Sequence, residues 1–195
     1  MEQDRETLCQ VCLLLYQRGY VVSNDGNVSV RIGEDQVLIT PSGVSKGRLT
    51  PDMLVVCDLE GRVLAGRLHP SSESAMHLLV YRERPDVGAV VHAHPPAATA
   101  FSICRRPLAQ HYLTETISGL GEVPVAPFAL PSTSQVPDSL RPYVAGCNGA
   151  LLANHGAIAW GRDLWHAFDR MEQVEQTAKI FALVHQLGGG VELSP

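Results

Sequence analysis

Three histidines stand at the ends of two apolar segments and have the spacing of metal ligands. His92 and His94 end the run that starts at Val87, and side chains two residues apart on a strand point to the same face. His155 follows a second apolar run, residues 150–153. Three neutral imidazoles with one open coordination position are typical of a catalytic zinc site. The alternative is that the pair is only hydrogen-bonded histidine at a polar strand end.

Three short polar loops, residues 24–27, 40–43 and 70–73, have the composition of anion-binding turns. The third loop opens a predicted helix over residues 71–84, whose free N–H groups and positive dipole end favour a phosphate. Any one of these loops is explained as an ordinary turn or cap. All three beside a metal signal indicate a phosphorylated small molecule, although neither a Walker loop nor a dinucleotide-binding glycine loop is present.

Glu73 falls in the first turn of that helix, where an acid either complements the dipole or serves as a general base beside the metal. Burial would raise its pKa toward neutrality, as proton transfer at carbon requires. His77 lies one turn later on the same helix face, and a supporting or packing role is favoured over metal ligation. Lys46, Arg105 and Arg106 are expected to be solvated surface charges rather than phosphate ligands.

The composition is that of a globular protein, since 45% of the 195 residues are hydrophobic and 18% are charged. One domain over residues 1–195 is predicted. The net charge of −5 argues against nucleic acid or an anionic membrane surface as a partner. No apolar run approaches the roughly 18–20 residues that span a membrane, and the charged start lacks a signal-peptide core. A cytoplasmic protein is therefore predicted.

Five cysteines in a chain without a secretion signal are predicted to be free thiols. Cys9 and Cys12 formally match a CxxC motif, but they lie in a helical apolar pattern and have no second pair. Core packing is therefore favoured over redox or zinc chemistry at these two positions.

The apolar periodicity predicts one α/β domain that contains short hairpins. The predicted strands cover residues 26–32, 37–39, 54–57, 62–64, 87–92, 123–126, 150–153 and 157–160. The predicted helices cover residues 4–19, 71–84, 97–103 and 140–145, with a long one from Asp163. The hairpins exclude an all-parallel sheet. Residues 105–150 are rich in proline and glycine and carry the weakest periodicity.

Five motifs follow one another in an order that is specific as a set. They are residues 26–31, 39–43, 70–73, 90–94 and 154–156. In this order they resemble the class II aldolase/adducin family, and most closely its L-fuculose-1-phosphate aldolase branch, over nearly the whole chain. The resemblance implies a three-layer α/β/α sandwich around a mixed, largely antiparallel sheet. It also implies a homotetramer with active sites at the subunit interfaces.

The resemblance further implies a role for each motif residue. His92, His94 and His155 would bind zinc, and Glu73 would be the acid/base, able to join the metal before substrate arrives. Tyr112, from the adjacent subunit, would assist at the aldehyde end. The phosphate would be held by residues of the three polar loops: Gly26, Asn27, Ser42, Gly43, Ser71 and Ser72. The implied reaction cleaves a ketose 1-phosphate to dihydroxyacetone phosphate and a small aldehyde.

Two departures from the family pattern bear on these expectations. Family aldolases often carry a longer C-terminal tail that closes the neighbouring site, so the end at Pro195 predicts that this lid is missing or replaced. Ser42 stands where the fuculose enzymes usually have threonine, and serine retains the hydroxyl.

Other activities of the same superfamily stay open. A 4-epimerase needs residues that hold and rotate the aldehyde, and none is identified. Decarboxylase relatives tend to have lysine in place of Ser72, which argues against that reaction, whereas a dehydratase is not excluded. A non-catalytic, adducin-like interaction module is disfavoured because the three histidines and Glu73 are all present.

Overall fold

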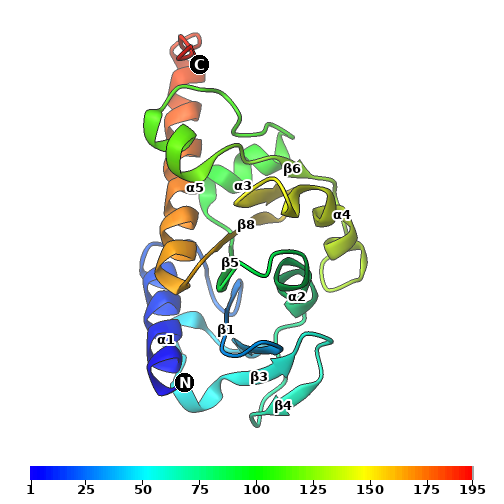
Figure 1. Cartoon of the computed structure of the whole chain (residues 1–195). Helices are drawn as coiled ribbons and strands as arrows, with labels where there is room; N and C mark the ends of the chain where they lie inside the picture. Colours follow the sequence, from blue (N-terminus) through cyan, green and yellow to red (C-terminus); the bar gives the residue numbers. More distant parts are fainter. Residues whose placement is uncertain (195) are drawn as a thin grey trace.

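The computed structural model describes residues 1–194, which fold into one eight-stranded sheet with helices on both faces (Figure 1). Pro195, where the predicted domain ends and the family's lid would follow, lies outside the described residues. The strands are β1 (Asn27–Arg31), β2 (Gln36–Ile39), β3 (Val55–Asp58), β4 (Val63–Ala65), β5 (Ala89–Ala93), β6 (Val125–Ala126), β7 (Gly149–Leu152) and β8 (Gly156–Gly161). The α-helices are α1 (Glu2–Gln17), α2 (Ser74–Glu83), α3 (Pro96–Ile103), α4 (Gln135–Val144) and α5 (Leu164–Gln186).

The sheet is mixed and largely antiparallel, with the strand order β4-β3-β2-β1-β5-β8-β7-β6. Every neighbouring pair is antiparallel except β6 and β7. In the central strand β5, His92 pairs with Asn27 of β1 on one side and with Ile158 of β8 on the other. This register brings the start of β1, the end of β5 and the start of β8 to one place.

Alternate side chains of the sheet pack against different helix layers, as the pleat requires. Ala89, Val91 and Ala93 of β5 belong to the core that α1, α3 and α5 cover, whereas Val90 belongs to the core that α2 and α4 cover. In Figure 1, α1 and α5 run along one side of the sheet, and α2 and α4 lie on the other. The predicted α/β/α sandwich is confirmed.

Both long helices bury an apolar face that the sequence pattern indicated. Asp163 caps α5 by accepting a hydrogen bond from the His166 backbone N–H at 2.8 Å. The face from Leu164 to Phe181 is buried against the sheet. Cys12 is buried on the inner face of α1, and the cysteines are free thiols, as predicted. Within residues 1–194, no helix is long and apolar enough to cross a membrane.

Two predicted helices begin at other residues in the structure, and three short helical turns were not predicted. Helix α2 begins at Ser74 rather than at residue 71, because residues 71–73 form a turn in which the Glu73 backbone N–H donates to Ser71 Oγ at 3.3 Å. Helix α4 begins five residues earlier than predicted, since Pro137 lies in its first turn, where no backbone N–H is needed. Short helical turns that no apolar pattern indicated cover Lys46–Arg48 (η1), Pro51–Met53 (η2) and Thr116–Leu120 (η3).

Candidate functional site

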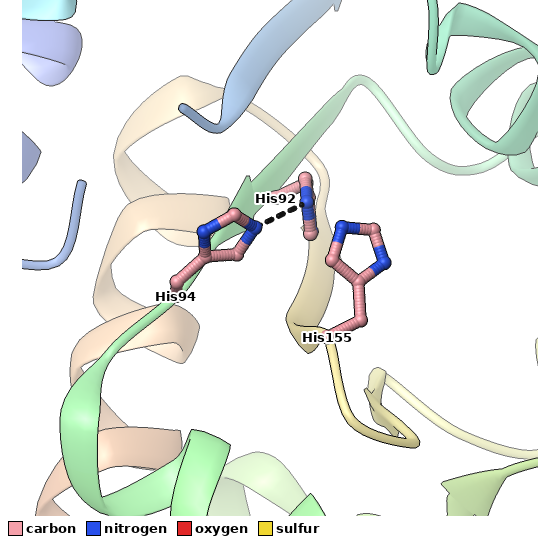
Figure 2. A group of neighbouring side chains, drawn as sticks. All are labelled: His92, His94 and His155. Carbon is pink, nitrogen blue, oxygen red and sulfur yellow. Dashed lines mark hydrogen bonds between the residues drawn. The ribbon is translucent and has the colours of Figure 1, made fainter. Parts of the chain in front are cut away.

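Three histidine side chains converge where β5 and β8 meet. His92 lies in β5, His94 directly after it, and His155 in the turn between β7 and β8. Figure 2 shows the three imidazoles around a common point, and one ring nitrogen from each lies within 4.8 Å of the others. The Nε2 atoms of His92 and His94 are 3.2 Å apart. The convergence predicted from spacing is therefore present in the fold.

The turn that carries His155 has a backbone that only certain residues tolerate. Asn154 has a φ of 56°, in the left-handed region that asparagine adopts more readily than most residues. A Cβ at Gly156 would lie 2.5 Å from the Ala93 carbonyl oxygen and 2.6 Å from His94 Cδ2. The asparagine and the glycine of this motif therefore allow β8 to approach His94 closely.

The His92 imidazole has a defined tautomer. Its Nδ1 lies 2.9 Å from the backbone oxygen of Ala157, and because a carbonyl only accepts, Nδ1 carries the proton. In the neutral ring Nε2 then carries the lone pair, and this atom lies 3.2 Å from His94 Nε2 and 3.4 Å from Glu73 Oε2. Lone pairs that converge in this way fit a cation between them, and the backbone bond to the far nitrogen is the usual outer support of a metal-bound histidine.

His94 is kept in the neutral form that binds metals. Burial is the main reason its pKa falls to about 3, and the neighbouring imidazoles of His92 and His155 lower it further. Asp25 Oδ2 lies 3.7 Å from His94 Nδ1 on the outer side of the ring. A neutral imidazole presents a lone pair to an ion at ordinary pH.

Glu73 lies at the N-cap of α2 and points its carboxyl group at the histidines. Oε2 accepts a hydrogen bond from Asn27 Nδ2 at 3.0 Å. Oε1 is buried and accepts no hydrogen bond from the described residues, although His155 Nε2 lies 3.1 Å away. A buried carboxylate oxygen without a donor is costly, so this atom also fits a cation.

The charge state of Glu73 differs from the sequence prediction. Burial raises the pKa of its carboxyl, but the imidazoles of His155 and His92 lower it more, and the net pKa lies below the ordinary value. The predicted rise toward neutrality is therefore wrong, because the prediction weighed burial and could not place the two imidazoles. Glu73 is an anion in this arrangement.

The three polar loops line one cavity beside the histidines. The cavity has a volume of about 240 Å³. Its walls include every residue predicted to hold the phosphate: Gly26, Asn27, Ser42, Gly43, Ser71 and Ser72. Glu73, His94 and His155 line the same space. One concave site thus combines a candidate metal centre, a carboxylate and many neutral hydrogen-bonding groups.

Lys46 is a site residue that the sequence reading missed. Its side chain is only 2% exposed and lines the cavity, so the expected solvated charge is wrong. Nζ donates to the backbone oxygens of Asn24 at 2.9 Å and Val44 at 3.1 Å, which leaves its third proton free of these two bonds. The sequence offered one signal for Lys46, which is that lysine is rare in it. Of the fifteen lysine and arginine residues, two are lysines, Lys46 and Lys179.

Tyr112 lies apart from this cavity within a single chain. Its ring packs edge-on against Phe181 of α5, with the ring centroids 5.1 Å apart, and it is near Gly190. Arg105 is exposed, as expected, and it donates a hydrogen bond to Asn154 Oδ1 next to the third histidine. The structure therefore brings together every predicted site residue except Tyr112.

The fold and the site define an α/β protein with an open three-histidine and carboxylate cluster beside a polar cavity. The model of the Class II Aldolase and Adducin N-terminal domain family matches residues 6–182. The chain belongs to this family, whose enzymes include aldolases and decarboxylases.

Curated relatives carry two different activities. A 3-oxo-tetronate 4-phosphate decarboxylase from Haemophilus influenzae is 36% identical over 185 residues, which are 91% of this chain and 86% of the relative. An L-fuculose phosphate aldolase from Methanococcus maripaludis is 33% identical over 190 residues, which are 94% of this chain and 99% of the relative. Among solved structures, an L-fuculose 1-phosphate aldolase matches with a TM-score of 0.93 and 33% identity, over 100% of this chain and 92% of that one.

Proposed function

We propose that this protein is a zinc-dependent class II aldolase. It cleaves a ketose 1-phosphate, L-fuculose 1-phosphate or a related deoxy-ketose 1-phosphate, to dihydroxyacetone phosphate and a small aldehyde. The observation that carries the proposal is the meeting of the ionised Glu73 carboxylate, whose Oε1 accepts no hydrogen bond, with three histidine imidazoles at the wall of a polar cavity of about 240 Å³.

The loops bind the phosphate and thereby place the reacting carbons. Backbone N–H groups and the hydroxyls of Ser42, Ser71 and Ser72 are suited to phosphate oxygens. Lys46 adds a buried positive charge to the same wall, and charge-assisted hydrogen bonds are the stronger kind. Fixing the phosphate holds the substrate against the histidine cluster, which is a gain from orientation.

Glu73 moves the proton at carbon. Cleavage of the C3–C4 bond leaves an electron pair on C3. The Glu73 carboxylate takes up a proton from water and delivers it to that carbon. In the synthetic direction the same carboxylate removes it. Bound to His92, His94 and His155, zinc would act as a Lewis acid that stabilises negative charge on the substrate oxygens.

The aldehyde end requires a group from outside this single-chain cavity. Tyr112 lies away from Glu73 within its own chain, so we place it in the site of an adjacent subunit, where it handles the proton on the C4 oxygen. A homotetramer with active sites at the subunit interfaces is part of the proposal.

Decarboxylation of 3-oxo-tetronate 4-phosphate is the second candidate, because the relatives that match this chain include enzymes of that name. Loss of carbon dioxide from that substrate leaves an electron pair on the same carbon of the same phosphorylated skeleton. Protonation by Glu73 then yields dihydroxyacetone phosphate again. Both reactions therefore use one phosphate site and one acid, and they differ in the fragment that leaves.

The test compares the leaving fragments. Zinc-loaded protein is incubated with L-fuculose 1-phosphate, 5-deoxyribulose 1-phosphate or 3-oxo-tetronate 4-phosphate, and dihydroxyacetone phosphate is measured with and without chelator. Chelator-sensitive release from a ketose 1-phosphate supports the aldolase. Release with carbon dioxide from the third substrate alone replaces it by the decarboxylase, and no release from any substrate refutes both.

A further inference from the structure

A series of hydrogen-bonded, buried polar side chains leads from Asn27, at the cavity wall beside Glu73, to Tyr81. It joins Tyr81 and His77 of α2 to Ser29 and Asn27 of β1, and all four side chains are buried. Tyr81 Oη lies 2.8 Å from Ser29 Oγ, which lies 2.7 Å from His77 Nδ1. His77 Nε2 lies 2.6 Å from Asn27 Oδ1, and Asn27 Nδ2 lies 3.0 Å from Glu73 Oε2.

The chemistry of the groups sets the direction of each bond. An ionised carboxylate only accepts, so the Asn27 amide turns its Nδ2–H toward Glu73 and its Oδ1 toward His77. Because Oδ1 only accepts, His77 carries its proton on Nε2. Nδ1 then accepts from the Ser29 hydroxyl, and Ser29 accepts from the Tyr81 hydroxyl.

The Tyr81 end of this hydrogen-bonded series prevents the bonds from reversing their direction. In the opposite direction Ser29 would donate to Tyr81, and the buried phenol proton would lose its acceptor, which is costly. Burial raises the pKa of Tyr81, so the phenol keeps its proton. Burial also lowers the pKa of His77 to about 3, so the ring stays neutral and has one N–H to donate.

We propose that His77 is a positioning residue, which holds the Asn27 amide with its N–H toward Glu73 throughout the reaction. The proposal rests on the proposed role of Glu73 in proton transfer. When Glu73 carries a proton, its own hold on the amide weakens, and an amide free to turn would present Oδ1 instead. His77 keeps Oε2 engaged, so Oε1, the oxygen without a donor, remains the one aimed at the histidine cluster.

The first test reads the tautomer directly and needs no activity. Nitrogen NMR of the purified protein is expected to show His77 as the neutral Nε2–H form from about pH 5 to pH 8, where an ordinary histidine titrates. Tyr81→Phe removes the hydroxyl that ends the hydrogen-bonded series, and in this variant the Nδ1–H form of His77 should become populated. Wild-type His77 in the Nδ1–H form, or a mixture of both, would overturn the proposal.

The second test measures the exchange of the C3 proton of dihydroxyacetone phosphate with solvent deuterium. His77→Leu leaves Asn27 Oδ1 without its donor, and we expect kcat for exchange to fall by about 10–100-fold, with a smaller change in KM. His77→Gln restores an N–H at this position and should recover most of the loss. Tyr81→Phe should lose less than His77→Leu, because the His77–Asn27 bond can still form.

A remote variant controls for stability alone. Thr177→Val removes a buried hydroxyl from the 3.1 Å bond to Thr116, far from Glu73 in the sequence and outside the cavity lining. It should destabilise the fold to a degree similar to Tyr81→Phe and leave exchange unchanged. Equal exchange in His77→Leu, His77→Gln and wild type, all folded and metal-loaded, would refute the positioning role.

The two tests separate this proposal from the proposed function. Wild-type protein that exchanges no proton, with His77 in the Nε2–H form and sensitive to Tyr81→Phe, refutes the function and supports the hold on Asn27. Wild-type exchange that is indifferent to His77 supports the function and refutes the positioning.

Discussion

The histidine cluster and the segment of residues 105–134 are built in opposite ways. Each cluster residue comes from a strand end or a helix cap, and its side chain meets partners from other elements. The segment has only the π-helical turn η3 and the two-residue strand β6, and it leaves large apolar side chains exposed, Phe128 at 58% and Leu130 at 57%. The histidine cluster is therefore fixed by contacts within one chain, whereas the segment leaves apolar side chains without cover in that chain.

Removal of one histidine should have the largest effect. His94→Ala deletes a proposed ligand, and zinc affinity should fall by more than the roughly 100-fold that loss of an outer partner costs. Activity should fall to background. Zinc per chain after dialysis, beside a turnover assay, checks this. Tyr112→Phe, in residues 105–134, is the matched control and should retain full zinc. Equal loss of zinc in both variants would contradict the assignment of metal binding to the histidine cluster.

Replacement of the acid should separate metal binding from proton transfer. Glu73→Gln keeps the side-chain shape and the three histidines, and it removes the group proposed to protonate C3. Turnover and solvent exchange of dihydroxyacetone phosphate should both fall by about 10²–10⁴-fold, with zinc retained. Tyr112→Phe should slow cleavage and leave exchange intact, because exchange does not involve the C4 oxygen. If Tyr112→Phe abolishes exchange as well, the division between the two regions is wrong.

Two glycines of the polar loops that line the cavity offer a comparison of backbone crowding. A Cβ at Gly26, whose φ is 69°, would lie 2.8 Å from the His92 carbonyl oxygen, whereas a Cβ at Gly43, whose φ is 73°, would meet no atom within 4 Å. Gly26→Ala should lower the free energy of unfolding by about 3 kcal/mol, from strain and crowding together. Gly43→Ala should lower it by about 1 kcal/mol, from strain alone. Urea denaturation of both variants measures the difference, and equal losses would contradict it.

The last prediction concerns how stability changes with pH. The pKa of His77 falls from 6.5 to about 3 on folding, mainly through burial, so between these values the unfolded chain binds a proton that the folded chain does not. Stability therefore rises with pH in this window, and it is lost as the pH falls from 6.5 toward 3, by about 1.4 kcal/mol per unit. In His77→Gln the slope should be shallower by this amount. Unchanged slopes in urea denaturation at several pH values would show that His77 is not buried as a neutral ring.

Much of the fold was predictable because each element carries its own period. The alternation along β1 and the apolar stripe of α5 are local signals, and both elements lie within a few residues of their predicted bounds. The start of α2 was misplaced, because Ser71 and Ser72 have the chemistry of a cap, while the turn that holds them depends on Thr40, whose backbone oxygen accepts from the Ser71 N–H at 3.1 Å.

Residue types and spacing by themselves determined the three histidines, Glu73 and the loops, since a two-residue interval on a strand defines a common face wherever the strand lies. Only the tertiary structure decided that Lys46 is buried in the cavity, that Glu73 is held as an anion by imidazoles, and that His77 supports Asn27. These features join residues about 20 to 80 positions apart, because strand pairing brings distant parts of the chain to one sheet end. No local pattern encodes such contacts.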